Sequence, residues 1–286
     1  MTSVISHPAP TNDAPTAAPP PADPARSRRR RWYRPLTLAG TIAQRSAAIA
    51  LLAAIWEFFP RLDLVDATFL PPLSQVLQAW WGLAADGELA QHIQASLIRS
   101  LSGLGLAVLI AVPLGLLIGW YRPVAALLGP LLEVFRNTAA LALMPVFILI
   151  LGLGETSKIS IIVYGCAWPI LLNTISGVRT VDPLLVRSAR SMGLAALRLF
   201  QKVVLPAAVP TIFTGIRLAG AYSILILIAA ELAGAKAGLG YLINYAQQNF
   251  DIGAMYAGII TISGIGLVIN QSLVYLERRF STWRTS

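Results

Sequence analysis

The chain has 286 residues, of which 56% are hydrophobic and only 12% are charged, with a mean hydropathy of +0.67. Because soluble domains carry about 25% charged residues, this composition excludes an ordinary soluble protein. The net charge of +9 would suit a nucleic-acid-binding protein, but the placement of the charges indicates a membrane and no nucleic acid. The single cysteine cannot form an intrachain disulfide, so cysteine usage does not indicate a redox compartment.

Residues 1–40 are predicted to form a disordered cytoplasmic tail. They are rich in Pro, Ala and Arg and poor in large aliphatic side chains, so they cannot bury enough apolar surface to order themselves. A cluster of arginines between Arg26 and Arg34 is expected to touch anionic lipid, with a regulatory contact as the alternative. This cluster comes late and a long apolar run follows it, which favours an uncleaved first span over a signal peptide.

Six apolar runs within a single membrane domain, residues 41–280, are long enough to cross a bilayer. They are too long and continuous for barrel strands, which alternate over about ten residues. The sequence therefore predicts an all-α polytopic membrane protein with six transmembrane helices, at about 41–59, 96–120, 132–151, 157–177, 211–234 and 254–276.

The distribution of basic residues orients these spans. With both termini in the cytoplasm, only Arg61, Arg99, Lys158 and Lys236 fall outside, and the other 18 of the 22 basic residues lie inside. This arrangement follows the positive-inside rule. Two outer segments result, and in the first of them, at about 60–95, Ser74 is expected to cap a helix.

A polar insert at residues 178–210 separates the fourth and fifth spans. Asp182 suits a helix N-cap, Pro183 suits the first helical position, and Gly193 suits the left-handed residue that ends a helix. The sequence predicts a short capped helix of about eleven residues here, followed by a second helical run that ends at Val203-Val204-Leu205-Pro206.

Candidate catalytic residues are scarce. There is no HExxH, no GxSxG, and no Cys or His cluster with metal-ligand spacing. The stretch Gly152–Lys158 lacks the spacing of a phosphate-binding loop and is interpreted as a tight turn. We therefore predict a chain that is not an enzyme, has no catalytic residue or metal site, and binds no ATP itself.

Polar residues inside the spans are candidates for a translocation path. Glu231 lies late in the fifth span, where it could line a pore or act as a structural hydrogen-bond partner, because charge in hydrocarbon is costly and usually functional. Asn137 opens the third span and Asn173 closes the fourth. Packing is the alternative role for these groups, as it is for the glycines of the second span at positions 103, 105, 115 and 119.

The insert resembles the cytoplasmic loop of binding-protein-dependent ABC importer permeases. Their signature is Glu-Ala-Ala, three residues, Gly, nine residues, Ile-x-Leu-Pro. Here Arg187-Ser188-Ala189 is followed by Gly193 and by Val203-Val204-Leu205-Pro206 at the same spacing. The leading acid of the family is Arg187 in this chain.

The resemblance implies the ABC type I importer permease fold in a bacterial inner membrane. It implies three kinds of protein partner: a cytoplasmic ABC ATPase dimer that uses ATP and Mg²⁺, an extracytoplasmic substrate-binding protein, and a second copy of the chain. The residues that it assigns to coupling with the ATPase are Asp182, Pro183, Leu184, Leu185, Arg187, Ser188, Ala189, Gly193, Leu205 and Pro206.

Further stretches, such as Ala229-Ala230-Glu231 and Gly238-Leu239-Gly240-Tyr241-Leu242-Ile243, are similar to the branch that imports aliphatic sulfonates, taurine and nitrate. Relatives that import a thiamine-pyrimidine precursor leave a second substrate class open. A secondary transporter is a further alternative, although such folds usually show internal repeats and ionisable residues at the midplane, and neither is found here.

Overall fold

The computed structural model describes residues 47–280. The chain divides into two compact units, residues 1–55 and residues 56–286. The predicted tail at 1–40 lies outside the described residues. The described residues of the first unit, 47–55, are helical, and so are residues 56–61 at the start of the second unit.

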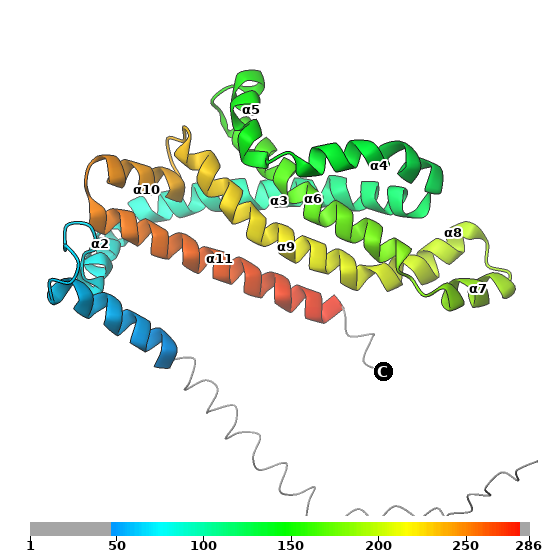
Figure 1. The fold of residues 1–286 in the computed structure, drawn as a ribbon, viewed down its shortest axis with the longest axis horizontal. Helices are drawn as coiled ribbons and strands as arrows, with labels where there is room; N and C mark the ends of the chain where they lie inside the picture. The colour runs from blue at the N-terminus through cyan, green and yellow to red at the C-terminus, as the bar shows by residue number, and fades with distance from the viewer. Residues whose placement is uncertain (1–46, 281–286) are drawn as a thin grey trace, which may run out of the picture. The chain divides into compact units, whose positions relative to one another are not determined.

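The second unit is built from helices joined by short turns (Figure 1). No strand occurs between residues 47 and 280. In chain order its elements are α2 (Leu73–Ala85), α3 (Glu88–Trp120), α4 (Arg122–Asn137), the 3₁₀ turn η1 (Ala140–Leu143), α5 (Met144–Leu151), α6 (Glu155–Arg179), α7 (Pro183–Ser191), α8 (Ala196–Leu199), the π-helical turn η2 (Phe200–Val204), α9 (Leu205–Leu232), α10 (Leu239–Gln248) and α11 (Ile252–Phe280).

Four of the described helices are long and apolar enough to cross a membrane, and a fifth crossing results if α4 and α5 count as one bent span. The four are α3, α6, α11 and the continuous helix Ala196–Leu232, which joins α8, η2 and α9. The first predicted span, 41–59, begins outside the described residues. These helices confirm an all-α polytopic membrane protein.

The predicted span 132–151 is not one straight helix. The chain bends by 86° between α4 and the η1–α5 segment. At the end of α4, Asn137 Nδ2 donates to the Glu133 carbonyl at 2.8 Å and Thr138 Oγ1 donates to the Val134 carbonyl at 3.1 Å. These bonds satisfy carbonyls that a continuing helix would use, and Pro145 in the first turn of α5 has no N–H to offer one. The average hydropathy of residues 132–151 does not show this bend, because the two helices together still pass as one apolar span.

The second helical run of the insert also differs from the prediction. It was expected to end at Leu205-Pro206, but these residues begin α9, and the helix continues from Ala196 to Leu232 without a break. The π turn at Phe200–Val204 lies just before Pro206, with only Leu205 between them. A π turn changes which carbonyl each amide pairs with. We therefore attribute to this turn the ability of the helix to continue through Pro206, which has no N–H to donate.

The core forms where α6 packs against both α3 and α9. Ile161, Ile162 and Ile170 of α6 are fully buried there. On α3, Gly115 lies against α6 so closely that a Cβ atom would come within 2.7 Å of Thr174 Cβ, whereas Gly105 faces open space. Small residues thus let α3 and α6 approach closely. Gly103 and Gly119 share this face with Gly115, and Gly105 does not.

The helix α2 is capped from a distance. Ser74 is not its N-cap, because the helix begins at Leu73 and Pro72 occupies the cap position. The cap is supplied by Glu57, whose carboxylate accepts from the Ser74 amide and from the Ser74 hydroxyl, each at 2.9 Å. Glu57 is therefore a helix-capping group, since a carboxylate satisfies a free first-turn amide and favours the positive end of the helix dipole.

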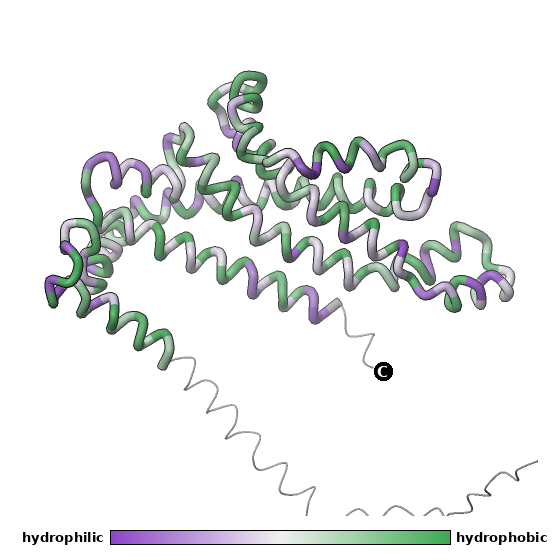
Figure 2. Tube along the Cα trace, viewed as in Figure 1, coloured by the Kyte–Doolittle hydropathy of each residue, from purple (hydrophilic) through white to green (hydrophobic). Residues whose placement is uncertain are grey.

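Large apolar side chains remain exposed along the spans. Leu109 of α3 is 70% exposed, Leu149 of α5 is 86% exposed and Leu267 of α11 is 64% exposed. Figure 2 shows hydrophobic residues along α3, α9 and the first half of α11, with hydrophilic residues at α7 and near the end of α11. Such a surface suits contact with lipid or with other membrane helices.

Candidate functional site

Two candidate sites lie at opposite ends of α6. Its N-terminal end, at Glu155, joins a cluster of buried charged groups, and its C-terminal end, at Arg179, leads into α7. The 25 residues of α6 span about 37 Å at 1.5 Å per residue, so the two sites are on opposite sides of a bilayer core of about 30 Å.

The helix α7 has the caps that the sequence predicts. The Asp182 carboxylate accepts from the Leu184 amide at 2.8 Å, and Pro183 is the first helical residue. Gly193 has a φ of +78°. Its amide donates to the Arg190 carbonyl at 2.9 Å, and the Leu194 amide donates to the Ala189 carbonyl at 3.2 Å, which is the hydrogen-bond pattern of a Schellman motif.

The surface of α7 has one anchored side and one open side. Ala189 is 3% exposed and fixes the helix against its neighbours. Leu184 and Leu185 are 67% and 52% exposed, and Arg187 and Ser188 are exposed as well. Two leucines that their own chain does not cover are available to a partner.

A small second core fixes this end of the molecule. Val178 of α6 packs with Val204, Ala208 and Ile212 of the continuous helix. Leu205 is half-buried and Pro206 is exposed next to this core. Leu205 and Pro206, which belong to the predicted coupling residues, therefore lie where α6 and the continuous helix pack together. The role of these residues in coupling stays a prediction.

At the opposite end of α6, the Glu231 carboxylate is the centre of a buried polar cluster. It accepts from the Ser96 hydroxyl at 2.8 and 3.0 Å, from Arg99 Nη1 at 2.7 Å and from the Gly240 amide at 2.8 Å. The Glu231 side chain is 0% exposed. A charge buried in this way is stable only when hydrogen bonds and an opposite charge surround it, and all of these are present.

Arg99 extends the cluster to two further elements. Its guanidinium also bonds both oxygens of Glu155, at 2.5 and 2.7 Å, and donates to the Ala237 carbonyl at 2.6 Å. The Arg99 side chain is 5% exposed. It therefore ties α3 to α6, to α9 and to the turn before α10. The sequence placed Arg99 only as an outer basic residue, and no short motif links it to acids 56 and 132 residues away.

The turn before α10 is held from the same side. The Gly238 amide donates to His92 Nδ1 at 3.1 Å, and the Leu239 amide donates to Ser96 Oγ at 2.8 Å. A Cβ atom on Gly240 would lie 2.7 Å from Glu231 Cβ and 2.9 Å from the Ile228 carbonyl oxygen. Glycine is thus required at position 240 for the backbone to approach the carboxylate.

The three predicted path residues are not brought into one site. Asn173 lies eighteen positions along α6 from Glu155, which is about 27 Å along the helix. Its side chain donates to the Pro169 carbonyl at 2.8 Å. Asn137 lies at the end of α4, and the Phe135 carbonyl near it accepts from the Tyr164 hydroxyl of α6 at 2.9 Å. Their place on a translocation path, like that of Glu231, stays a prediction.

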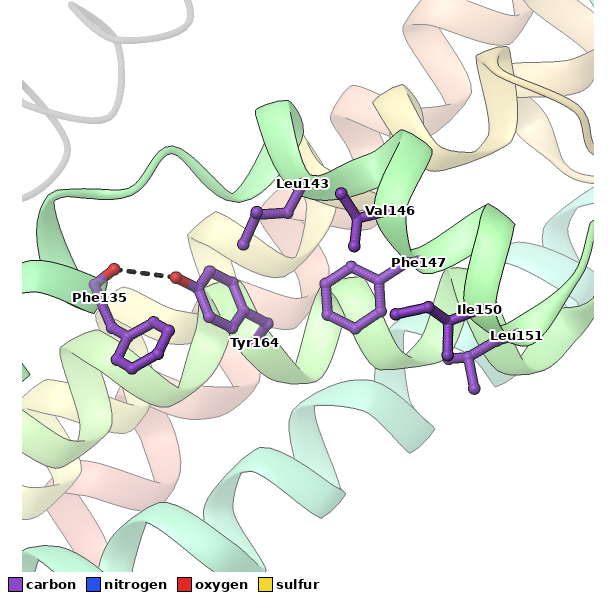
Figure 3. Close-up of a pocket in the computed structure, with 7 residues that line it drawn as sticks. All are labelled: Phe135, Leu143, Val146, Phe147, Ile150, Leu151 and Tyr164. Atoms are coloured by element: carbon purple, nitrogen blue, oxygen red, sulfur yellow. Dashed lines mark hydrogen bonds between the residues drawn. The ribbon is translucent and has the colours of Figure 1, made fainter. Parts of the chain in front are cut away.

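An apolar cavity of about 370 Å³ lies beside the bend between α4 and α5 (Figure 3). In this view the Tyr164 ring lies between Phe135 and Phe147, and its hydroxyl bonds the Phe135 carbonyl. The lining offers no cation, so this cavity does not itself suit an anionic solute. It is lined by Phe135, Leu143, Val146, Phe147, Ile150, Leu151 and Tyr164.

These features define a class of protein. The part of the chain that the structure describes has several helices long and apolar enough to span a membrane, a short capped polar helix between two of them, and no group of His, Cys, Asp and Glu that could hold a metal ion. Among solved structures, its fold is similar to the MetNI methionine ABC transporter in inward-facing conformations, with a TM-score of 0.58 and 18% identity over 69% of this chain and 98% of that one.

The sequence comparisons give the family. Residues 111–282 match the family described as binding-protein-dependent transport system inner membrane component. The taurine transport system permease protein TauC of Escherichia coli K12 is 34% identical over 90% of this chain and 94% of its own. The chain belongs to this family of ABC transporter permeases, as a multi-pass protein of the inner membrane.

Two further relatives are named for the transport of other solutes. A Bacillus subtilis 168 protein named for aliphatic sulfonates transport, SsuC, is 36% identical over 83% of this chain and 86% of its own. The bicarbonate transport system permease protein CmpB of Synechococcus elongatus is 35% identical over 64% of this chain and 66% of its own.

Proposed function

We propose that this chain is the membrane-spanning subunit of an ATP-driven importer for a small anionic solute, namely an aliphatic sulfonate, taurine or nitrate. The observation that carries the substrate class is the set of relatives named for taurine, aliphatic sulfonates and bicarbonate. These solutes share a small anionic acid group. A thiamine-pyrimidine precursor is the alternative solute.

In the proposed assembly, two copies of the chain form the translocation path, and a pair of cytoplasmic ATPases binds and hydrolyses ATP with Mg²⁺. An extracytoplasmic binding protein delivers the solute. The capped helix α7, with its exposed Leu184 and Leu185, docks in a groove on the ATPase. The chain itself contributes no catalytic group and no cofactor.

The energy of ATP binding then reaches the membrane through α7. Closure of the two ATPases moves α7, and its attachment to α6 and α9 through the small core at Val178 and Val204 carries this movement into the spans. The path opens alternately to the two sides of the membrane, which is a rigid-body transition between two states.

Uptake into proteoliposomes tests this proposal. The chain is reconstituted with its ATPase and its binding protein, and accumulation of labelled taurine, an alkanesulfonate, nitrate and bicarbonate is measured with ATP inside. We expect accumulation of at least one of these anions with ATP and none with a non-hydrolysable analogue. Uptake driven by a proton gradient without ATP would contradict the proposal and favour a secondary transporter.

A further inference from the structure

The segment around α7 has an excess of positive charge. Between residues 179 and 202 the only acid is Asp182, and its carboxylate already accepts from the Leu184 amide at 2.8 Å. Five basic residues share this segment, and all are exposed. None of them forms an ion pair with any residue between 47 and 280. They are Arg179, Arg187, Arg190, Arg198 and Lys202.

Two of these cations are aligned with Leu184, one of the two exposed leucines. Leu184, Arg187 and Arg190 follow one another at intervals of three along the nine residues of α7, and residues three apart lie on neighbouring positions of a helix surface. Leu184 is 67% exposed. The open side of α7 therefore presents an apolar contact followed by two guanidinium groups.

A membrane surface could attract such a helix, but the length of the neighbouring helix argues against it. The continuous helix Ala196–Leu232 has 37 residues, which is about 55 Å at 1.5 Å per residue. The hydrocarbon core is only about 30 Å thick. Measured from the Glu231 end, about 25 Å of this helix exceeds the hydrocarbon thickness, and the excess length lies toward the Ala196 end, where α8 and η2 contact α7. An interfacial helix instead lies at the boundary of headgroups and acyl chains.

We infer that the ATPase partner presents to α7 an apolar socket bordered by carboxylates, which receives Leu184 and pairs with Arg187 and Arg190. This inference rests on the proposed function, because the partner in question is the ATPase. Arginine suits such a contact because its planar guanidinium binds a carboxylate through two parallel hydrogen bonds and tolerates removal from water better than an ammonium does. Charge complementarity then selects the cognate ATPase and excludes one whose groove is basic.

Charge reversal tests the inference. The full chain in nanodiscs is titrated with its ATPase in the absence of nucleotide, and the affinity is compared for the parent, for Arg187→Glu with Arg190→Glu, and for Leu184→Asp. The matched control is Arg122→Glu, an exposed arginine at the start of α4. We expect the double reversal to weaken binding by at least about ten-fold, the control to bind as the parent does, and added salt to weaken parent binding.

Rescue identifies the partner groups. Each surface Asp or Glu of the ATPase groove is changed to Lys, and one such variant is expected to restore binding of the doubly reversed chain. If the double reversal binds as tightly as the parent while Leu184→Asp does not bind, the inference is wrong and the proposed docking stands. If neither variant changes binding, both fail.

The lipid alternative has its own readout. A maleimide fluorophore on Leu184→Cys is measured without ATPase in nanodiscs of phosphatidylcholine alone and in nanodiscs that also contain phosphatidylglycerol. We expect the same emission in both, because α7 lies in water. A blue shift that requires phosphatidylglycerol would show that anionic lipid occupies this face and would overturn the inference.

Discussion

The carboxylate of Glu231 accepts a hydrogen bond from the backbone amide of Gly240 at 2.8 Å. This bond closes the turn between α9 and α10, and the Arg99 guanidinium holds the same carboxylate at 2.7 Å from α3. One buried acid thus fixes the turn and the spans together, and the two sequence stretches that contain Glu231 and Gly240 meet at this point.

Removing the charge of Glu231 is expected to destabilise the protein strongly. Glu231→Gln leaves the nearly buried Arg99 with Glu155 alone, and Glu155 is 61% exposed. Breaking a buried ion pair costs about 3–5 kcal/mol. The measurement is thermal unfolding in detergent. The control is Glu133→Gln, which breaks an exposed pair with Arg136 and should cost less than about 1 kcal/mol. Equal effects of the two changes would show that the cluster around Glu231 does not stabilise the fold.

Adding one methyl group at position 240 is expected to disrupt the same cluster. In Gly240→Ala the new Cβ would lie 2.7 Å from Glu231 Cβ and 2.9 Å from the Ile228 carbonyl oxygen, so the turn has to move. Gly264 of α11 is the control, since no heavy atom lies within 4 Å of a Cβ there. Gly264→Ala should be neutral or stabilise by up to about 1 kcal/mol. Hydrogen exchange of the turn at 233–239 would report the difference, and unchanged protection in Gly240→Ala would contradict the prediction.

Position 193 tests whether the end of α7 matters for transport. Gly193 has a φ of +78° and open space around it, so a substitution there acts through the backbone alone. We expect Gly193→Val to abolish uptake while the spans still insert, because a β-branched residue strongly disfavours this conformation. Asparagine tolerates it, so Gly193→Asn should retain transport. Normal uptake by the valine variant would show that this loop does not couple the ATPase to the spans.

The N-terminal tail provides a prediction from sequence alone. Deletion of residues 1–25 should leave ATP-driven uptake intact, because this Pro-rich and Ala-rich segment cannot bury enough apolar surface to build a site. The measurement is the initial rate of uptake per inserted protein. Complete loss of transport after the deletion would assign the tail a function.

Local chemistry explains which features could be predicted from the sequence. The ends of α7 depend on Asp182, Pro183 and Gly193, which act within one or two turns of their own positions, so their sequence pattern was sufficient. Long apolar runs likewise predicted α3, α6 and α11. The bend after Asn137 was missed because the apolar residues on either side of the polar stretch at 136–138 were taken as one run, so these polar residues were placed at the start of a span and not at a break. The cluster around Glu231 was missed because Ser96 and Arg99 reach it only through tertiary packing, across more than 130 residues.

The helix Ala196–Leu232 passes through Pro206 and Pro210 without a break, and this continuity has a mechanical consequence. A movement applied at α8 can therefore reach the other side of the bilayer through a single helix, in which the π turn at Phe200–Val204 and Pro210 are the positions most able to bend. The first left-handed backbone positions beyond that end are Gly234 and Gly238, with φ of +143° and +123°. The backbone freedom beyond this helix is therefore concentrated within a few residues of the buried Glu231 carboxylate.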